Sequence, residues 1–157
     1  FHITNSSQNT IDLLSSLHEN FKEWELKKEL SLLELSETVL SRPFSTLSQG
    51  EQIKTLIGAM FIKENRFLLL DEPTTHLDHE GKEILKKYLQ SKQGFILVSH
   101  DRDFLDSIID HVLSINKTTI EVQKGTFSTW HQNKERHDQA EISENEVLQK
   151  DLKRLNG

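Results

Sequence analysis

Hydrophobic residues recur at two different periods along the chain, and the period changes near residue 67. Between residues 10 and 62, apolar side chains return every three or four positions, which is the spacing of amphipathic helices. Beyond that point, the short apolar runs Phe67–Leu70 and Phe95–Val98 alternate with helical patterns. We therefore expect a helical region followed by strands and helices in alternation, which indicates a parallel α/β layer.

The helical region is predicted to contain two segments before Pro43 and one after it. The apolar positions with helical spacing are Ile11, Leu13, Leu14, Leu17 and Phe21 in the first segment and Leu26, Leu30, Leu33 and Leu35 in the second. The third helix is expected over 48–63. Residues 1–46 show no chemistry of their own, so we interpret them as a helical subdomain with an amphipathic core.

The remaining pattern predicts two helices, a hairpin and a long C-terminal helix. The predicted helices are 80–90 and 103–109, and the predicted hairpin strands are 112–115 and 119–122 around Asn116-Lys117. From Ser128 the chain has no Pro and no Gly before Gly157 and is dense in charged residues. Leu148, Leu152 and Leu155 repeat at four-three spacing, the start of a coiled-coil-like seam. We expect a solvated helix that leaves the globular part; the alternative is an ordinary helix packed on its own domain.

Composition narrows the classes of protein to which the chain can belong. A length of 157 residues suits one domain, although 34% hydrophobic residues is lean for a closed α/β core. The absence of Cys excludes disulfides and thiolate zinc sites, and a net charge of -6 argues against a chain-wide nucleic-acid surface. No membrane span or signal peptide is apparent, so a soluble protein is expected. The chain starts at Phe1, so we expect the native N-terminus to lie upstream.

Two adjacent carboxylates, Asp71 and Glu72, follow the apolar run directly and precede Pro73. Such charge against a buried strand is costly unless something binds it, and hydrated Mg²⁺ with a phosphate would do so. Because neighbouring strand residues face opposite sides, Asp71 can hold metal-bound water while Glu72 turns toward a nucleophilic water. Both lie at a strand's carboxyl end, where open α/β sheets bind ligands. The structural alternative is a strand followed by an acidic turn.

Three further polar segments carry candidate chemistry. Ser48 and Glu51 have the spacing of a capping box at the start of the third helix, and Gly50 would let a phosphate approach the backbone there. Asp78 is placed to cap the next helix, or to position groups across an interface near a nucleotide. His100 follows the second strand and could hydrogen-bond a γ-phosphate or the attacking water if the two strands are neighbours.

The order of these segments resembles the second half of an ATP-binding cassette (ABC) ATPase, a P-loop NTPase fold, over about residues 43–116. Residues 47–52 resemble the family signature, 67–72 the Walker B strand, 74–78 the D-loop and His100 the switch histidine. The resemblance implies ATP and Mg²⁺ as cofactors and ATP hydrolysis as the activity. It implies catalytic Glu72 and His100, metal-binding Asp71, and nucleotide-binding Ser48, Gln49, Gly50, Glu51 and Asp78.

The sequence of residues 73–78, Pro-Thr-Thr-His-Leu-Asp, resembles that of the ABC-F branch, with Thr75 where Asn is usual. Gln49 replaces a common Gly of the signature. Members of this branch carry two cassettes on one chain, lack membrane domains and act on ribosomes. The resemblance therefore implies a cytoplasmic protein whose partners are a second cassette and the ribosome, with its rRNA and tRNA. Residues 42–46 are similar to antibiotic-resistance members that protect the ribosome.

No G-x-x-x-x-G-K-[ST] phosphate loop and no glutamine loop occur in the sequence. We therefore expect a partial first cassette that is inactive by itself and leaves an apolar flank of its sheet exposed. Its expected parts are a helical subdomain (1–46), a signature, Walker B and switch-histidine part (47–127) and the start of an interdomain linker helix (128–157). One alternative is the ATPase subunit of a membrane transporter. Another is a chromosome-maintenance ATPase, in which the coiled coil would precede the signature.

Overall fold

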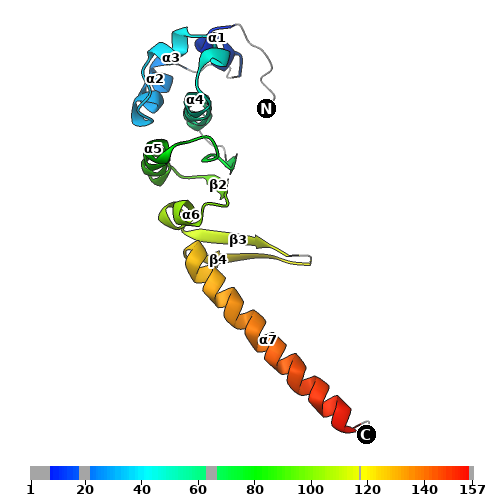
Figure 1. Cartoon of the computed structure of the whole chain (residues 1–157). Coiled ribbons are helices and arrows are strands. Elements are labelled where there is room, and N and C mark those ends of the chain that lie inside the picture. Colours follow the sequence, from blue (N-terminus) through cyan, green and yellow to red (C-terminus); the bar gives the residue numbers. More distant parts are fainter. Residues whose placement is uncertain (1–7, 18–21, 63–66, 117, 156–157) are drawn as a thin grey trace. The chain divides into compact units, whose positions relative to one another are not determined.

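The structure is a computed structural model that describes residues 8–17, 22–62, 67–116 and 118–155 (Figure 1). The chain divides into two compact units, residues 1–104 and 105–157, and each is described by itself. Several predicted features lie outside the described residues, namely Phe21 of the first helical segment, Lys63 of the third helix and Lys117 of the hairpin turn.

The first unit begins with helices, as the apolar spacing predicts, although the described residues before Pro43 form three helices and not the two predicted segments. They are α1 (Thr10–Leu17), α2 (Glu23–Leu32), α3 (Thr38–Ser41), the 3₁₀ turn η1 (Phe44–Thr46) and α4 (Gln49–Phe61). The second predicted segment ends earlier than its leucines suggest, because Glu34 takes a left-handed backbone conformation with φ of 53°. Leu33 is nevertheless fully buried just beyond the end of α2.

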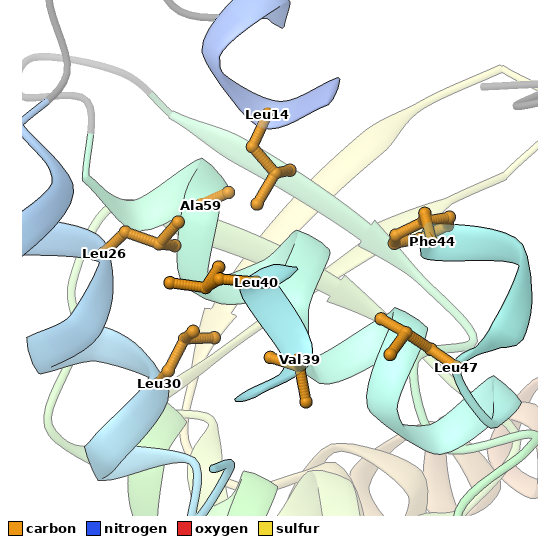
Figure 2. Packing of buried hydrophobic residues seen from close by; sticks show 8 residues of the cluster. All are labelled: Leu14, Leu26, Leu30, Val39, Leu40, Phe44, Leu47 and Ala59. Carbon is orange, nitrogen blue, oxygen red and sulfur yellow. The ribbon is translucent and has the colours of Figure 1, made fainter. Parts of the chain in front are cut away.

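Buried side chains from these helices meet in one apolar cluster (Figure 2). Its members are Leu14, Leu26, Leu30, Val39, Leu40, Phe44, Leu47 and Ala59. Phe44 and Leu47 lie directly before α4, so the cluster fixes the segment on which the predicted signature depends. The start of α1 is tied to the same segment, because Thr10 donates to the Arg42 carbonyl from both its amide (2.9 Å) and its hydroxyl (2.8 Å).

Two parallel strands follow, joined by a helix. β1 (Leu68–Asp71) pairs with β2 (Phe95–Val98) in parallel, and α5 (His79–Gln90) lies between them in the sequence. Phe67, predicted as a strand residue, lies outside β1 because the pairing starts with the Leu68 amide, which donates to the Gly94 carbonyl at 2.9 Å. These elements confirm the parallel α/β layer.

The two faces of the β1–β2 sheet differ in burial. Leu68 and Leu70 are buried, whereas Leu69, Ile96 and Val98 are exposed by 63%, 40% and 46%. An apolar sheet surface is therefore open to solvent, as predicted from the sequence. Since β1 alternates between faces, Asp71 shares the exposed side with Leu69.

The second unit contains the predicted hairpin and the long helix. α6 (Arg102–Ile108) leads into it, β3 (His111–Ile115) pairs antiparallel with β4 (Ile120–Lys124), and α7 spans Phe127–Leu155. The Gly125 amide closes the base of the hairpin by donating to the Asp110 carbonyl at 2.8 Å. Asp106 then receives the Ser128 amide at 2.9 Å and the Ser128 hydroxyl, which fixes the start of α7.

The long helix exposes apolar side chains along its length. Ile142 and Leu148 are exposed, as expected for a solvated helix, while the side chains of Leu152 and Leu155 lie outside the described set. Among the described residues, no helix combines the length and the apolar character that crossing a bilayer requires.

Candidate functional site

The segment that opens α4 has the predicted capping box. The Ser48 hydroxyl accepts from the Glu51 amide at 3.2 Å, and the Glu51 carboxylate accepts from the Ser48 amide at 2.7 Å. The two bonds use the amides of residues 48 and 51. The amides of Gln49 and Gly50 lie in the first helical turn, where no intrahelical acceptor is available, and remain at the positive end of the helix.

Arg42 supports this helix start from outside. Its guanidinium donates to the Thr46 carbonyl at 2.7 Å and lies 3.4 Å from the Glu51 carboxylate. The bond from the Ser48 amide, together with the Ser48 hydroxyl and the charge of Arg42, lowers the pKa of Glu51. Glu51 is therefore held ionised, and its carboxylate is hydrogen-bonded to the Ser48 amide at the start of the helix.

The D-loop segment packs against the signature segment. A methyl group on Gly50 would lie 3.3 Å from the Leu77 side chain, and one on Gly81 would lie 2.9 Å from the Asp78 carboxylate. Asp78 caps α5 by accepting from the Gly81 amide at 2.8 Å, which is the structural role predicted for it. A side chain at position 81 would therefore displace the capping carboxylate, whereas one at position 50 would make only a tight contact with Leu77.

A cavity of about 370 Å³ lies between these two segments. All five residues predicted to bind the nucleotide line it: Ser48, Gln49, Gly50, Glu51 and Asp78. Four residues that the sequence analysis did not select also line it: Lys54, His76, Leu77 and Gly81. Lys54 could have been found, since it lies four residues after Gly50 and so on the same face of α4.

The acid pair lies where the sequence predicted, at the carboxyl end of β1. Asp71 is the last strand residue and is exposed, and the Glu72 amide extends the ladder by donating to the Val98 carbonyl at 2.9 Å. Glu72 has a φ of 47°, a left-handed conformation that non-glycine residues rarely adopt. Such strain persists only where the surroundings enforce it, and it concentrates at functional sites.

The Glu72 side chain is only partly satisfied by its neighbours. Its Oε1 lies 3.6 Å from His100 Nε2, and its Oε2 lies 3.5 Å from the Ser99 hydroxyl, at the limit of a hydrogen bond. Within the described part of the chain, Oε1 is buried and has no hydrogen-bond partner. The His100 ring is fully exposed. The structure thus brings Glu72 and His100 together at the ends of adjacent strands, as predicted. The Glu72 Oε1 atom, which faces His100, accepts no hydrogen bond from the described residues.

The loop that carries His100 is anchored by an ion pair that the sequence did not reveal. Lys82 of α5 lies 2.7 Å from the Asp101 carboxylate, which also caps α6 by accepting from the Phe104 amide at 3.1 Å. Lys82 above all, and then the Phe104 amide, lower the pKa of Asp101. The two partners are 19 positions apart, so no local pattern links them.

The residues present fit Mg²⁺ and a nucleotide. Mg²⁺ is usually held by one or two carboxylates together with waters and substrate phosphates, and Asp71 supplies an exposed carboxylate at the strand end. No group of three or more potential metal ligands occurs among the described residues, so the metal would depend on phosphate and water. The helix-start amides beside Gly50, which has no side chain to cover them, suit a phosphate.

The amino-acid sequence is similar to an ABC family model and to proteins described as ATP-binding or as acting in translation. The family model "ABC transporter" matches residues 3–75. "Probable ATP-binding protein YheS" of Escherichia coli K12 is 40% identical over 99 residues, which cover 62% of this chain and 16% of that protein. "Energy-dependent translational throttle protein EttA" of Mycobacterium tuberculosis H37Rv is 37% identical over 89 residues, covering 56% of this chain and 16% of that protein. The chain therefore matches about a sixth of the length of these relatives.

Solved structures show the same fold. "An inward-facing conformation of a putative metal-chelate type ABC transporter" superposes with a TM-score of 0.62 at 24% identity, over 79% of this chain and 56% of that one. At this identity the similarity concerns the fold alone. It agrees with the sheet and helix arrangement expected from the sequence.

Proposed function

Since the chain belongs to the ABC family of ATP-binding proteins, with relatives of the ABC-F type, we propose that it is the signature-bearing part of a cassette that hydrolyses ATP on the ribosome. The observation that carries this proposal is the strained, partly unsatisfied Glu72 beside His100 at a strand's carboxyl end. ATP hydrolysis by such a cassette requires a phosphate-binding loop. Residues 1–157 contain no sequence with the pattern of that loop. The isolated chain is therefore expected to show no ATP turnover.

In this proposal Asp71, Glu72 and His100 serve one nucleotide. Asp71 would hold Mg²⁺, which would supply positive charge to the phosphoryl group being transferred. Glu72 orients the attacking water and accepts its proton at Oε1, the buried oxygen that lacks a partner in the described structure. His100, whose ring is exposed, is free to hydrogen-bond the γ-phosphate or the same water.

The cavity between the signature and the D-loop serves a second nucleotide. Ser48 and the amides of Gln49 and Gly50 bind the phosphates of ATP held mainly by a partner cassette on the same full-length chain. Glu51 supports them by fixing the helix start, and Asp78 positions the D-loop across the same interface. The close packing of Leu77 against Gly50 supports this arrangement, because it joins the two segments into one binding surface.

Three observations favour the ribosome as partner. EttA, to which the chain is similar, is described as a translational throttle protein. The sequence of residues 73–78 resembles that of the ABC-F branch. In addition, α7 is long and exposed, which suits a linker that contacts rRNA or tRNA. Protection against antibiotics and a cytoplasmic location belong to the same proposal.

A second candidate is the ATPase subunit of a membrane transporter. The family model favours it, since that model is described as an ABC transporter. In that case the helices of the first unit would receive a segment of a membrane-spanning partner.

Sedimentation with ribosomes separates the two candidates. The complete gene product, incubated with a non-hydrolysable ATP analogue, is expected to sediment with ribosomes and to be released when the analogue is replaced by ADP. A product that stays in the supernatant in both conditions, and co-purifies instead with a membrane-spanning subunit, contradicts the ribosomal proposal and supports the transporter.

A further inference from the structure

A cluster of polar and aromatic side chains lies away from the candidate site, among α2, α4 and α5. Glu29 of α2 accepts at one oxygen, Oε2, from the Tyr88 hydroxyl at 2.5 Å and from the Lys92 ammonium at 2.6 Å. The partners are 59 and 63 positions apart in the sequence. We call Glu29, Tyr88 and Lys92 the anchor cluster.

The anchor cluster is buried enough for its contacts to matter. Tyr88 is 2% exposed, and the Glu29 and Lys92 side chains are exposed by 12% and 18%. Charge-assisted hydrogen bonds in such surroundings are strong, and removing one partner leaves a charge buried without compensation. Burial, and secondly the bond to Glu29, raise the pKa of Tyr88, so the phenol stays protonated and can donate.

Aromatic rings tie the same cluster to the end of α4. The Lys92 ammonium lies 4.7 Å from the centre of the Tyr88 ring and 5.6 Å from that of Phe61, the last residue of α4. Phe61 also packs edge-to-face against Tyr88, with ring centres 5.6 Å apart. The cluster therefore joins α2 to the C-terminal ends of both α4 and α5.

The opposite ends of these two helices form the candidate site. Ser48 caps the N-terminus of α4 and Asp78 caps that of α5, so the signature and the D-loop are each one helix length, roughly 20 Å, from the anchor cluster. A change in the angle between two rigid helices at one end displaces their other ends. The separation of the two segments that line the cavity thus depends on how the distant ends are held.

α2 also contacts α4 midway along its length. The Lys54 ammonium donates to the Leu33 carbonyl at 3.3 Å. A side chain on Gly58 would meet Leu33 at 3.2 Å and Glu29 at 3.5 Å, so the two segments approach closely. The contact of α2 with α4 is therefore fixed by close packing, whereas the link of α2 to α5 includes the polar bonds of Glu29 with Tyr88 and Lys92.

We propose that Glu29, Tyr88 and Lys92 are positioning residues that set the separation between the signature segment and the D-loop segment by holding α5 against α2 and α4. The importance of that separation for ATP hydrolysis rests on the proposed function. The separation itself does not, and it can be measured without nucleotide.

Spin labels measure the separation directly in the 157-residue chain. Since the chain has no Cys, Gln49→Cys and Glu80→Cys, both at exposed positions, introduce the only two labelling sites. Dipolar broadening between the two nitroxides is compared in the background of Glu29→Gln, Lys92→Met and Tyr88→Phe. We expect the first two substitutions to give a wider distribution of separations, and Tyr88→Phe, which keeps the ring and loses only the hydroxyl, to give a smaller change in the same direction.

Matched controls separate positioning from general loss of stability. Lys27 of α2 forms exposed ion pairs with Glu23 of the same helix and with Glu37. Glu23→Gln removes the first pair and Lys27→Met removes both, and each substitution should leave the distribution unchanged. Lys92→Arg keeps the charge and should retain the separation. If Lys92→Met fails to fold, judged by circular dichroism, the comparison of Tyr88→Phe with the unmodified background decides the question.

Two results overturn the proposal. One is an unchanged distribution in folded Glu29→Gln and Tyr88→Phe together with a lower melting temperature, which would make the cluster a source of stability only. The other is equal broadening by Lys27→Met. Either result leaves the proposed ATPase function standing, whereas absence of nucleotide binding in the complete protein would not affect this measurement.

Discussion

The signature segment and the acid-pair segment lie in the same unit and are stabilised in opposite ways. At the signature, the side chains that line the cavity have hydrogen-bond or ion-pair partners. These interactions are the Ser48–Glu51 capping box, the contact of Arg42 with Glu51, and the cap that Asp78 forms on α5. At the acid pair, Glu72 is strained, one of its oxygens lacks a described partner, and the ring of His100 is exposed. The first segment is therefore preorganised, while the second retains unsatisfied groups that a metal, a phosphate or a water can use.

The largest effect is expected at the unsatisfied segment. His100→Ala in the complete protein should lower kcat for ATP hydrolysis by about 10²-fold, because it removes a group positioned beside Glu72, and should leave ATP binding nearly unchanged. His79→Ala, at an exposed position at the start of α5, is the matched control and should retain activity. Equal loss of activity in both variants would remove the distinction between the two histidines.

At the preorganised segment the expected effect is on stability. Ser48→Ala removes the hydroxyl that accepts from the Glu51 amide, so the free energy of unfolding of the chain should fall by about 1 kcal/mol in urea titrations. Ser31→Ala, at an exposed position inside α2, should change it by less than about 0.5 kcal/mol. Similar values for the two variants would show that the capping box does not stabilise the signature helix.

Two residues with left-handed backbones differ in the role expected of their side chains. Glu34 and Glu72 have φ values of 53° and 47°, so replacing either by Gly should relieve strain and raise the free energy of unfolding by about 1 kcal/mol. Glu34→Gly, at the end of α2, should retain ATP hydrolysis in the complete protein, whereas Glu72→Gly should lose it. Retained activity in Glu72→Gly would mean that hydrolysis does not require the Glu72 carboxylate.

Local patterns predicted the elements and their order well. The Ser-x-x-Glu spacing gave the capping box, the run Phe95–Val98 matched β2 residue for residue, and the strand ends placed Glu72 and His100 together. These features depend on propensity and periodicity, which a sequence carries directly.

Contacts between distant segments could not be predicted in the same way. Lys82 with Asp101 and Glu29 with Lys92 are ordinary charged residues in their local sequence, and only the packing of α5 brings them together. The early end of α2 was missed because Leu33 and Leu35 continue the helical spacing past Glu34. The strain at Glu72 likewise arises from tertiary constraints and has no sequence pattern.

The most direct test of the account is ATP binding and hydrolysis by Glu72→Gln in the complete protein, measured side by side. Glutamine keeps the size of the side chain but cannot accept the water's proton. We expect kcat to fall by about 10²- to 10⁴-fold while ATP affinity stays within a few-fold of the unmodified protein. Equal loss of binding and hydrolysis, or unchanged hydrolysis, would contradict the assignment of Glu72 as the group that activates water.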